Sequence, residues 1–226
     1  FTGKNQTELE GTQSLLILQL VKKALKDRKL GETRIAAKSL KQLIDQYPES
    51  VEAHRAYIET KVMLKDTQEI QAWYTDLVRT HPDHAVYQYG QALALSYAEP
   101  PDLPLVIRLL ERAMKKDPAL GYVHQTLGWA YEQTERTSGN KGYLEKAEQE
   151  YRIALELNDA DRFPDVESQL LLNLGNTYLA LSNFREAYRH YLQRDEQFSP
   201  TDETMTELLY RKNYGEAGFK AGRTEE

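Results

Sequence analysis

Three prolines recur at a nearly constant spacing, and this period constrains the fold more than any other feature of the sequence. Pro48, Pro82 and Pro118 lie 34 and 36 residues apart, and each closes an amphipathic segment. Apolar residues stand twelve, eight and five positions before each proline, which is the spacing of one face of an α-helix. The proline ends the helix because it cannot donate the next backbone hydrogen bond. These nine positions, which we expect in the core, are Ala36, Leu40, Leu43, Ile70, Tyr74, Leu77, Val106, Leu110 and Ala113.

Further helical patterns lie between these segments, so the helices come in pairs. They cover residues 51–64, 85–98 and 122–133. No sustained period-two alternation bounded by hairpin turns is visible, which argues against strands. We therefore expect an all-α chain of roughly eleven helices. Two stretches, 98–104 and 135–143, interrupt the period, and we interpret both as loop insertions.

Composition excludes several classes of protein. The net charge of −6 comes from mixed signs, which argues against non-specific binding to nucleic acid. The longest apolar-rich run, residues 14–21, is far shorter than the roughly 18 residues of a membrane helix, so we expect no direct membrane insertion. The absence of cysteine excludes thiolate sites and favours a bacterial protein. Because the chain begins Phe1-Thr2-Gly3, we expect a fragment of a longer protein, and we leave its compartment open between cytoplasm and periplasm.

Residues 171–191 place small and aromatic side chains at characteristic intervals. The pattern consists of Leu171, Leu174, Gly175, Tyr178, Ala187 and Tyr191, and the preceding repeat has Leu127, Gly128, Tyr131, Ala147, Tyr151 and Ala154. Small residues let two helices approach closely, and tyrosines fill the space beside that contact. The chain therefore resembles the tetratricopeptide repeat family, whose unit is a hairpin of helix A and helix B. It departs from the family at Arg194, where alanine is usual, and at Asp159, which replaces the closing proline.

The resemblance implies a right-handed α-solenoid, in which stacked hairpins form a superhelix with a concave groove lined by helices A. It covers nearly all of the chain as a single domain of five repeats and one half repeat. The expected boundaries are 14–48, 49–82, 83–118, 119–159, 163–200 and, for the half repeat, 201–223. A terminal helix A without its helix B leaves an apolar face uncovered, so self-association through this half repeat is one expectation.

Motifs for enzymatic chemistry are absent from the sequence. It contains no phosphate-binding glycine loop, no dinucleotide fingerprint, no HExxH and no GxSxG. The pair His81 and His84, with Asp83 between them, could bind a metal, but proline and aspartate are expected at a helix end in any case. We therefore expect a non-catalytic protein without a cofactor or metal.

The register of the repeats selects the residues that face the groove. In the last three helices A these are Tyr122, Gln125, Trp129, Glu132, Gln169, Asn173, Asn176, Lys212, Asn213 and Glu216, and the same face includes Leu172, Leu179, Leu209 and Phe219. Amide side chains can bond a peptide backbone in both directions, and aromatic side chains supply contact area at low entropic cost. The alternative is that Trp129 packs between helices and the asparagines only satisfy local polar groups.

These residues favour a scaffold that binds a partner peptide or protein segment in the groove. Some members of the family hold the acidic tail of a chaperone with a lysine and an asparagine on one helix A. Here the fifth repeat has Leu172 with Asn176 and the sixth has Lys212 with Glu216, so we do not expect that ligand. The alternative function is a regulatory or spacer arm of a larger multidomain enzyme, sensor or envelope assembly protein.

Overall fold

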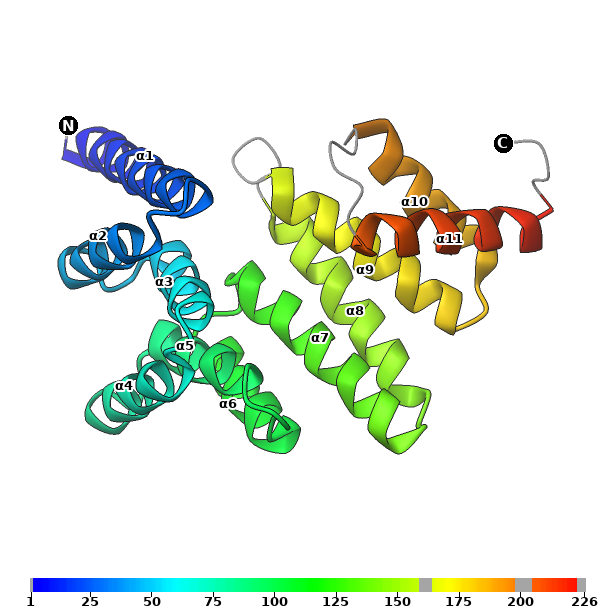
Figure 1. Ribbon diagram of the computed structural model, residues 1–226. Helices are drawn as coiled ribbons and strands as arrows, with labels where there is room; N and C mark the ends of the chain where they lie inside the picture. Colours follow the sequence, from blue (N-terminus) through cyan, green and yellow to red (C-terminus); the bar gives the residue numbers. More distant parts are fainter. Residues whose placement is uncertain (1, 159–163, 198–204, 223–226) are drawn as a thin grey trace. The chain divides into compact units, whose positions relative to one another are not determined.

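The computed structural model describes residues 2–158, 164–197 and 205–222 of the chain (Figure 1). The described residues form helices and turns without strands, which confirms the expected all-α fold of about eleven helices. The helices are α1 (Thr2–Lys29), α2 (Thr33–Gln46), α3 (Val51–Met63), α4 (Thr67–Thr80), α5 (Ala85–Ser96), α6 (Leu103–Lys116), α7 (Gly121–Ser138), α8 (Gly142–Leu157), α9 (Pro164–Ala180), α10 (Phe184–Gln197) and α11 (Met205–Lys220). None of the helices in these ranges is long and apolar enough to cross a membrane.

The chain divides into two compact units. Unit 1 covers Phe1–Asp117 and contains α1 to α6, and unit 2 covers Pro118–Glu226 and contains α7 to α11. Helices adjacent in sequence pack together as pairs, most extensively α7 with α8, α9 with α10, and α5 with α6. Alternate helices also touch: α3 contacts both α1 and α5, and α9 contacts α11. Each unit is therefore a stack of helix pairs.

The apolar positions before the three prolines form the core of unit 1. Eight of the nine predicted residues are buried, and Leu77 is partly buried. The helices also end where the prolines predict, because α2, α4 and α6 stop at Gln46, Thr80 and Lys116, two residues before each proline. The proline period thus identified both the buried face and the ends of these helices.

Glycines on three helices lie directly under tyrosine rings. A Cβ added to Gly90 would lie 2.1 Å from the Tyr74 ring, and one added to Gly175 would lie 2.2 Å from the Tyr191 ring. Gly128 has the same relation to Tyr151, at 2.6 Å. No side chain larger than hydrogen fits at such distances. The nearest atoms to Gly175 belong to Tyr191 rather than to Ala187, so the close contact joins a glycine to a ring.

Three helix pairs are joined by turns of one type. Gly31, Lys65 and Ser182 have positive φ angles of 88°, 64° and 60°. In each turn the N–H of the following residue bonds to a carbonyl five positions earlier, at 3.0, 3.0 and 2.8 Å. This pattern is the Schellman motif, which ends a helix with one left-handed residue and is usually built on glycine. Lys65 and Ser182 adopt this backbone without being glycine.

The two predicted loop insertions have different outcomes. Residues 98–102 lie in the connection between α5 and α6, and Leu103 and Pro104 begin α6, so most of that prediction is confirmed. Residues 135–143 were expected to be a loop, and this expectation was wrong. Helix α7 continues to Ser138 and α8 begins at Gly142, so the additional residues lengthen both helices. Gly139 ends α7 in the left-handed conformation, at φ 68°.

Candidate functional site

The predicted groove residues lie on α7, α9 and α11 of unit 2. Gln125 is buried, and Gln169 and Lys212 are exposed. The residues of intermediate exposure are Tyr122, Trp129, Glu132, Asn173, Asn176, Asn213 and Glu216. Their hydrogen bonds show which of them are already used by the fold and which have atoms left to bind a ligand.

Glu132 joins three helices of unit 2. Its Oε2 accepts a hydrogen bond from the Tyr151 hydroxyl on α8 at 2.9 Å, and its Oε1 accepts one from the Thr177 hydroxyl on α9 at 2.8 Å. Burial raises the pKa of this carboxyl, while the two hydroxyl donors lower it. Both carboxylate oxygens are therefore engaged in holding α7, α8 and α9 together. The sequence predicts Glu132 as a groove residue, and in the fold its carboxylate already accepts from two neighbouring helices.

Asn176 forms the equivalent link one repeat later. Its Oδ1 accepts hydrogen bonds from the Tyr191 hydroxyl on α10 at 2.7 Å and from the Asn213 amide on α11 at 2.9 Å. Only the amide oxygen can accept from two donors, so these bonds fix the orientation of the side chain. Within the described residues, the Asn176 Nδ2 and the Asn213 Oδ1 have no hydrogen-bond partner. One donor group and one acceptor are left side by side on α9 and α11.

The other polar candidates make local contacts. The Gln169 amide donates to the Asn173 Oδ1 at 2.8 Å along the exposed side of α9. Glu216 accepts from Lys220 at 2.6 Å, and this lysine lowers the pKa of the Glu216 carboxyl. Lys212 is exposed on the same helix. These side chains remain candidates, because surface pairs of this kind contribute little to stability and are easily exchanged for ligand contacts.

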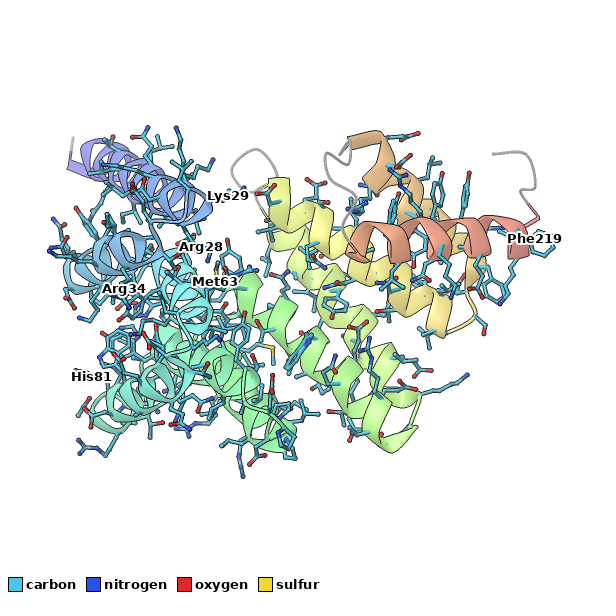
Figure 2. The ribbon with its side chains drawn as sticks, in the orientation of Figure 1. Arg28, Lys29, Arg34, Met63, His81 and Phe219 are labelled. Carbon is cyan, nitrogen blue, oxygen red and sulfur yellow. The ribbon has the colours of Figure 1, made fainter. Side chains whose placement is uncertain are left out.

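Two apolar side chains of α11 are unusually exposed. Leu209 is 52% exposed and Phe219 is 71% exposed, and Figure 2 shows Phe219 at the C-terminal end of the helix. The register of the repeats placed both on the groove face. Leu172, which the register placed on the same face of α9, is instead buried at 6% exposure.

Sequence reasoning missed a buried polar position that recurs six residues after each proline. His54 and His124 each contact the carbonyl of their proline through Nε2, at 3.0 Å in both cases, and the Gln88 amide contacts Pro82 in the same way. The constant spacing from Pro48, Pro82 and Pro118 is a signal that could have found it. The position stabilises the turn that leads from one helix pair into the next.

The two histidines at this position have opposite shifts in pKa. The Nδ1 of His54 faces the Tyr74 hydroxyl at 2.6 Å, and burial lowers the pKa of this histidine to about 4. The Nδ1 of His124 faces the Glu150 carboxylate at 2.7 Å, and this hydrogen bond raises the pKa of His124. A hydroxyl can donate to a neutral imidazole, whereas a carboxylate favours the charged form. Burial therefore favours the neutral form of His54, whereas the Glu150 carboxylate favours the charged form of His124.

The pair His81 and His84 lies at the connection between α4 and α5. His84 contacts the Glu49 carboxylate at 3.0 Å through Nε2, and its ring stacks on Tyr87 with centroids 3.6 Å apart. Among the described residues no group of three or more histidine, aspartate or glutamate side chains could hold a metal ion. The stacked ring and the contact with Glu49 explain His84 as part of the turn.

Comparison with known proteins identifies the architecture. No protein-family model and no curated protein matches the chain. Among solved structures, TTC0263, a thermophilic TPR protein in Thermus thermophilus, matches with a TM-score of 0.60 and 20% identity, covering 90% of this chain and 99% of that one. The chain has the tetratricopeptide-repeat fold. The expected α-solenoid of antiparallel helix pairs is thereby confirmed.

Two further solved structures share the tetratricopeptide-repeat fold. MamA 41-end from Desulfovibrio magneticus RS-1 has a TM-score of 0.52 and 19% identity, over 80% of this chain and 94% of that one. YrrB, described as a TPR protein with an unusual peptide-binding site, has a TM-score of 0.51 and 15% identity, over 85% and 90%. In this fold α7, α9 and α11 are helices A, and α8 and α10 are helices B. Glu132 and Asn176 therefore each join a helix A to its own helix B and to the next helix A.

Proposed function

We propose that the chain is a non-catalytic interaction scaffold that binds an extended segment of a protein partner along the helices A of unit 2. The observation that supports this most directly is the oriented amide pair of Asn176 and Asn213. The free Nδ2 of Asn176 can donate to a peptide carbonyl, and the free Oδ1 of Asn213 can accept a peptide N–H. This is the complement of one peptide unit, and it requires no particular side chain on the partner.

The fold holds this pair in place before any ligand arrives. The Asn176 oxygen is bonded from both α10 and α11, so its amide group is not free to rotate. A group fixed in its binding geometry loses less entropy when it binds. Preorganisation of this kind suits a scaffold that orders a flexible partner segment on its surface.

Exposed apolar side chains on α11 supply a second element of recognition. Leu209 lies four positions before Asn213, and Phe219 lies three positions after Glu216, so all four lie near one side of the helix. A partner whose backbone meets the amide pair would place an apolar side chain against Leu209 or Phe219. Self-association through α11 stays a prediction that uses the same exposed helix.

The substitution Asn176→Asp tests the proposal without removing the structural bonds. Aspartate keeps an acceptor for the Tyr191 hydroxyl and the Asn213 amide, but it replaces the free NH₂ with a second acceptor. Peptides would be selected from a displayed library of random sequences on the parent protein, synthesised, and measured by fluorescence anisotropy. We expect Asn176→Asp to lower the affinity for these peptides at least about tenfold, which corresponds to about 1.4 kcal/mol in binding free energy.

Asn183→Asp is the matched control, because it adds the same charge outside the groove. Asn183 caps α10 by accepting from the Glu186 N–H at 3.4 Å, and aspartate is equally suited to that position. It should leave peptide affinity unchanged. Equal affinity of the Asn176→Asp variant and the parent, with helical content preserved in both, would refute a role of this amide. Failure to select any peptide would favour the spacer-arm function.

A further inference from the structure

A cluster of charged side chains lies where three alternate helices of unit 1 meet. Arg28 comes from the end of α1, whereas Arg55 and Glu59 lie one turn apart on α3 (Figure 2 labels Arg28). The Glu59 Oε1 accepts from the Arg55 Nε at 2.9 Å, and its Oε2 accepts from the Arg28 Nη1 at 3.4 Å. Tyr97 follows α5 and faces the same charges, because Glu59 raises the pKa of its hydroxyl and both arginines lower it, after the larger effect of burial.

One carboxylate of the cluster serves two positive side chains. The guanidinium groups of Arg28 and Arg55 both contact Glu59. Lys61 on the same helix differs, because it pairs with both Asp66 and Glu69, at 2.6 and 2.9 Å. Lys61 thus has two carboxylates, whereas Arg28 shares its carboxylate with Arg55.

Arg28 is the group whose bonding is least complete. Its side chain is 17% exposed, and Nη1 alone contacts both Glu59 and the Thr60 hydroxyl, each at 3.4 Å. Both distances are at the long end for hydrogen bonds. Within the described residues, Nε and Nη2 of Arg28 have no hydrogen-bond partner, and neither is among the buried atoms left without one. A guanidinium has five N–H donors in a fork that matches the two oxygens of a carboxylate.

Apolar surface lies beside the charges. Met63 is 59% exposed and stands four positions after Glu59, one turn further along α3 (Figure 2 labels Met63). Tyr97 is 38% exposed. Exposed methionine and tyrosine at the edge of a charged site are typical of surfaces that bind a protein segment.

We infer that this face of unit 1 binds a carboxylate side chain of a protein partner, an aspartate or glutamate flanked by an apolar residue. The carboxylate would take the free N–H groups of Arg28, and the apolar residue would contact Met63 or Tyr97. A carboxylate brings a single negative charge to Arg28, whereas a phosphate dianion would bring a second charge close to Glu59. The site is independent of the amide pair in unit 2, and its test involves neither Asn176 nor Asn213.

The probes are two acetylated, amidated dipeptides that differ in one group. One contains aspartate followed by leucine, and the other contains asparagine followed by leucine. Each would be titrated into the ¹⁵N-labelled full chain while the arginine Nε–Hε resonances are followed by NMR, with the Arg28 signal assigned by its loss in Arg28→Gln. We expect a saturable shift of the Arg28 signal with the aspartyl peptide, and none with the asparaginyl peptide at the same concentrations.

Two substitutions should change the affinity in opposite directions. Arg28→Gln should lower the affinity for the aspartyl peptide at least about tenfold, as measured on the remaining arginine signals. Glu59→Gln removes the competing carboxylate and should tighten the same peptide by about threefold or more. Arg79→Gln, which removes an equally charged but 72% exposed side chain of unit 1, should have no effect.

Opposite effects of the two variants exclude general unfolding as the cause, because an unfolded protein could not bind more tightly. Equal binding of the aspartyl and asparaginyl peptides would overturn the inference, and so would weaker binding by Glu59→Gln. Tighter binding of a phosphoseryl peptide than of the aspartyl peptide would also overturn the inference, because the ligand would then be a phosphate.

Discussion

Protonation of His54 should destabilise unit 1 as the pH falls. The imidazole is fully buried, its Nε2 donates to the Pro48 carbonyl, and its Nδ1 accepts from the Tyr74 hydroxyl. A second proton would have to displace the Tyr74 hydrogen bond and place a charge in the core. Burial accordingly lowers the pKa of His54 from 6.5 to about 4.

The size of the effect follows from this difference in pKa. Because the folded-state pKa is the lower one, the contribution to stability is complete above the unfolded pKa of 6.5 and is lost as the pH falls toward 4. The linkage relation gives a loss in the free energy of unfolding of about 2 kcal/mol at pH 5 and about 3 kcal/mol at pH 4. His190 in unit 2, whose pKa burial also lowers to about 4, acts in the same direction.

His54→Gln isolates the contribution of His54. The chain itself suggests this substitution, because Gln88 occupies the equivalent position and its amide reaches the Pro82 carbonyl. A glutamine can donate to Pro48 and accept from Tyr74, but it does not titrate. Between pH 7.5 and pH 5 we expect the free energy of unfolding to fall by about 2 kcal/mol less in the variant than in its parent. The contribution of His190 is common to both proteins and cancels.

Urea unfolding at each pH, followed by tryptophan fluorescence, provides the measurement. Trp73 reports on unit 1, where its ring lies 5.5 Å from Tyr57 and 4.8 Å from Tyr74, and Trp129→Phe in both proteins removes the signal of unit 2. His81→Gln, which removes an exposed histidine, is the control and should behave as the parent does. Parallel pH profiles of the parent and His54→Gln would refute the reasoning.

Two backbone features give predictions that thermal unfolding can check. Gly175→Ala should destabilise by about 1–3 kcal/mol, because its Cβ would overlap the Tyr191 ring, whereas Gly215→Ala, with nothing within 4 Å, should stabilise by about 0.5–1 kcal/mol. A similar loss at both glycines would mean that packing is not the cause. Ser182→Gly should raise the free energy of unfolding by about 1 kcal/mol, because glycine adopts the left-handed conformation without steric cost, and a decrease would contradict this.

The fold was predictable because its signals are local. A proline, a buried face at spacings of three and four, and a glycine lie within one helix or its next turn, so Pro48 and Leu40 can be interpreted without knowing the rest of the structure. The stretch 135–143 shows the limit of this approach. Its interruption of the repeat period suggested a loop, but Glu135 to Ser138 continue α7, because they extend a helix that already packs along α8.

The candidate site was predictable only in part, because its contacts join distant residues. The register placed Asn176 on a helix A, yet its partners Tyr191 and Asn213 lie 15 and 37 residues away. Glu132 and Thr177 are 45 residues apart. The Asn176 oxygen is thus already bonded within the fold, and its NH₂ group is what is left for a partner. The pairing of Arg28 with Glu59 was not predicted for the same reason, because the two residues are 31 positions apart in the sequence.

The links through Glu132 and Asn176 also limit how the repeats can be rearranged. A carboxylate on α7 meets a hydroxyl on α9, and an amide oxygen on α9 meets an amide on α11, so the two junctions use different chemistry. If the repeats are aligned on Gly128, Gly175 and Gly215, deleting α9 and α10 would place Ala217 where Thr177 now meets Glu132, and the carboxylate would lose that donor. Such a junction would have to be redesigned on both helices. The residues at each junction therefore constrain the order of the repeats. New arrays should be built by exchanging the paired residues of a junction together, rather than one repeat at a time.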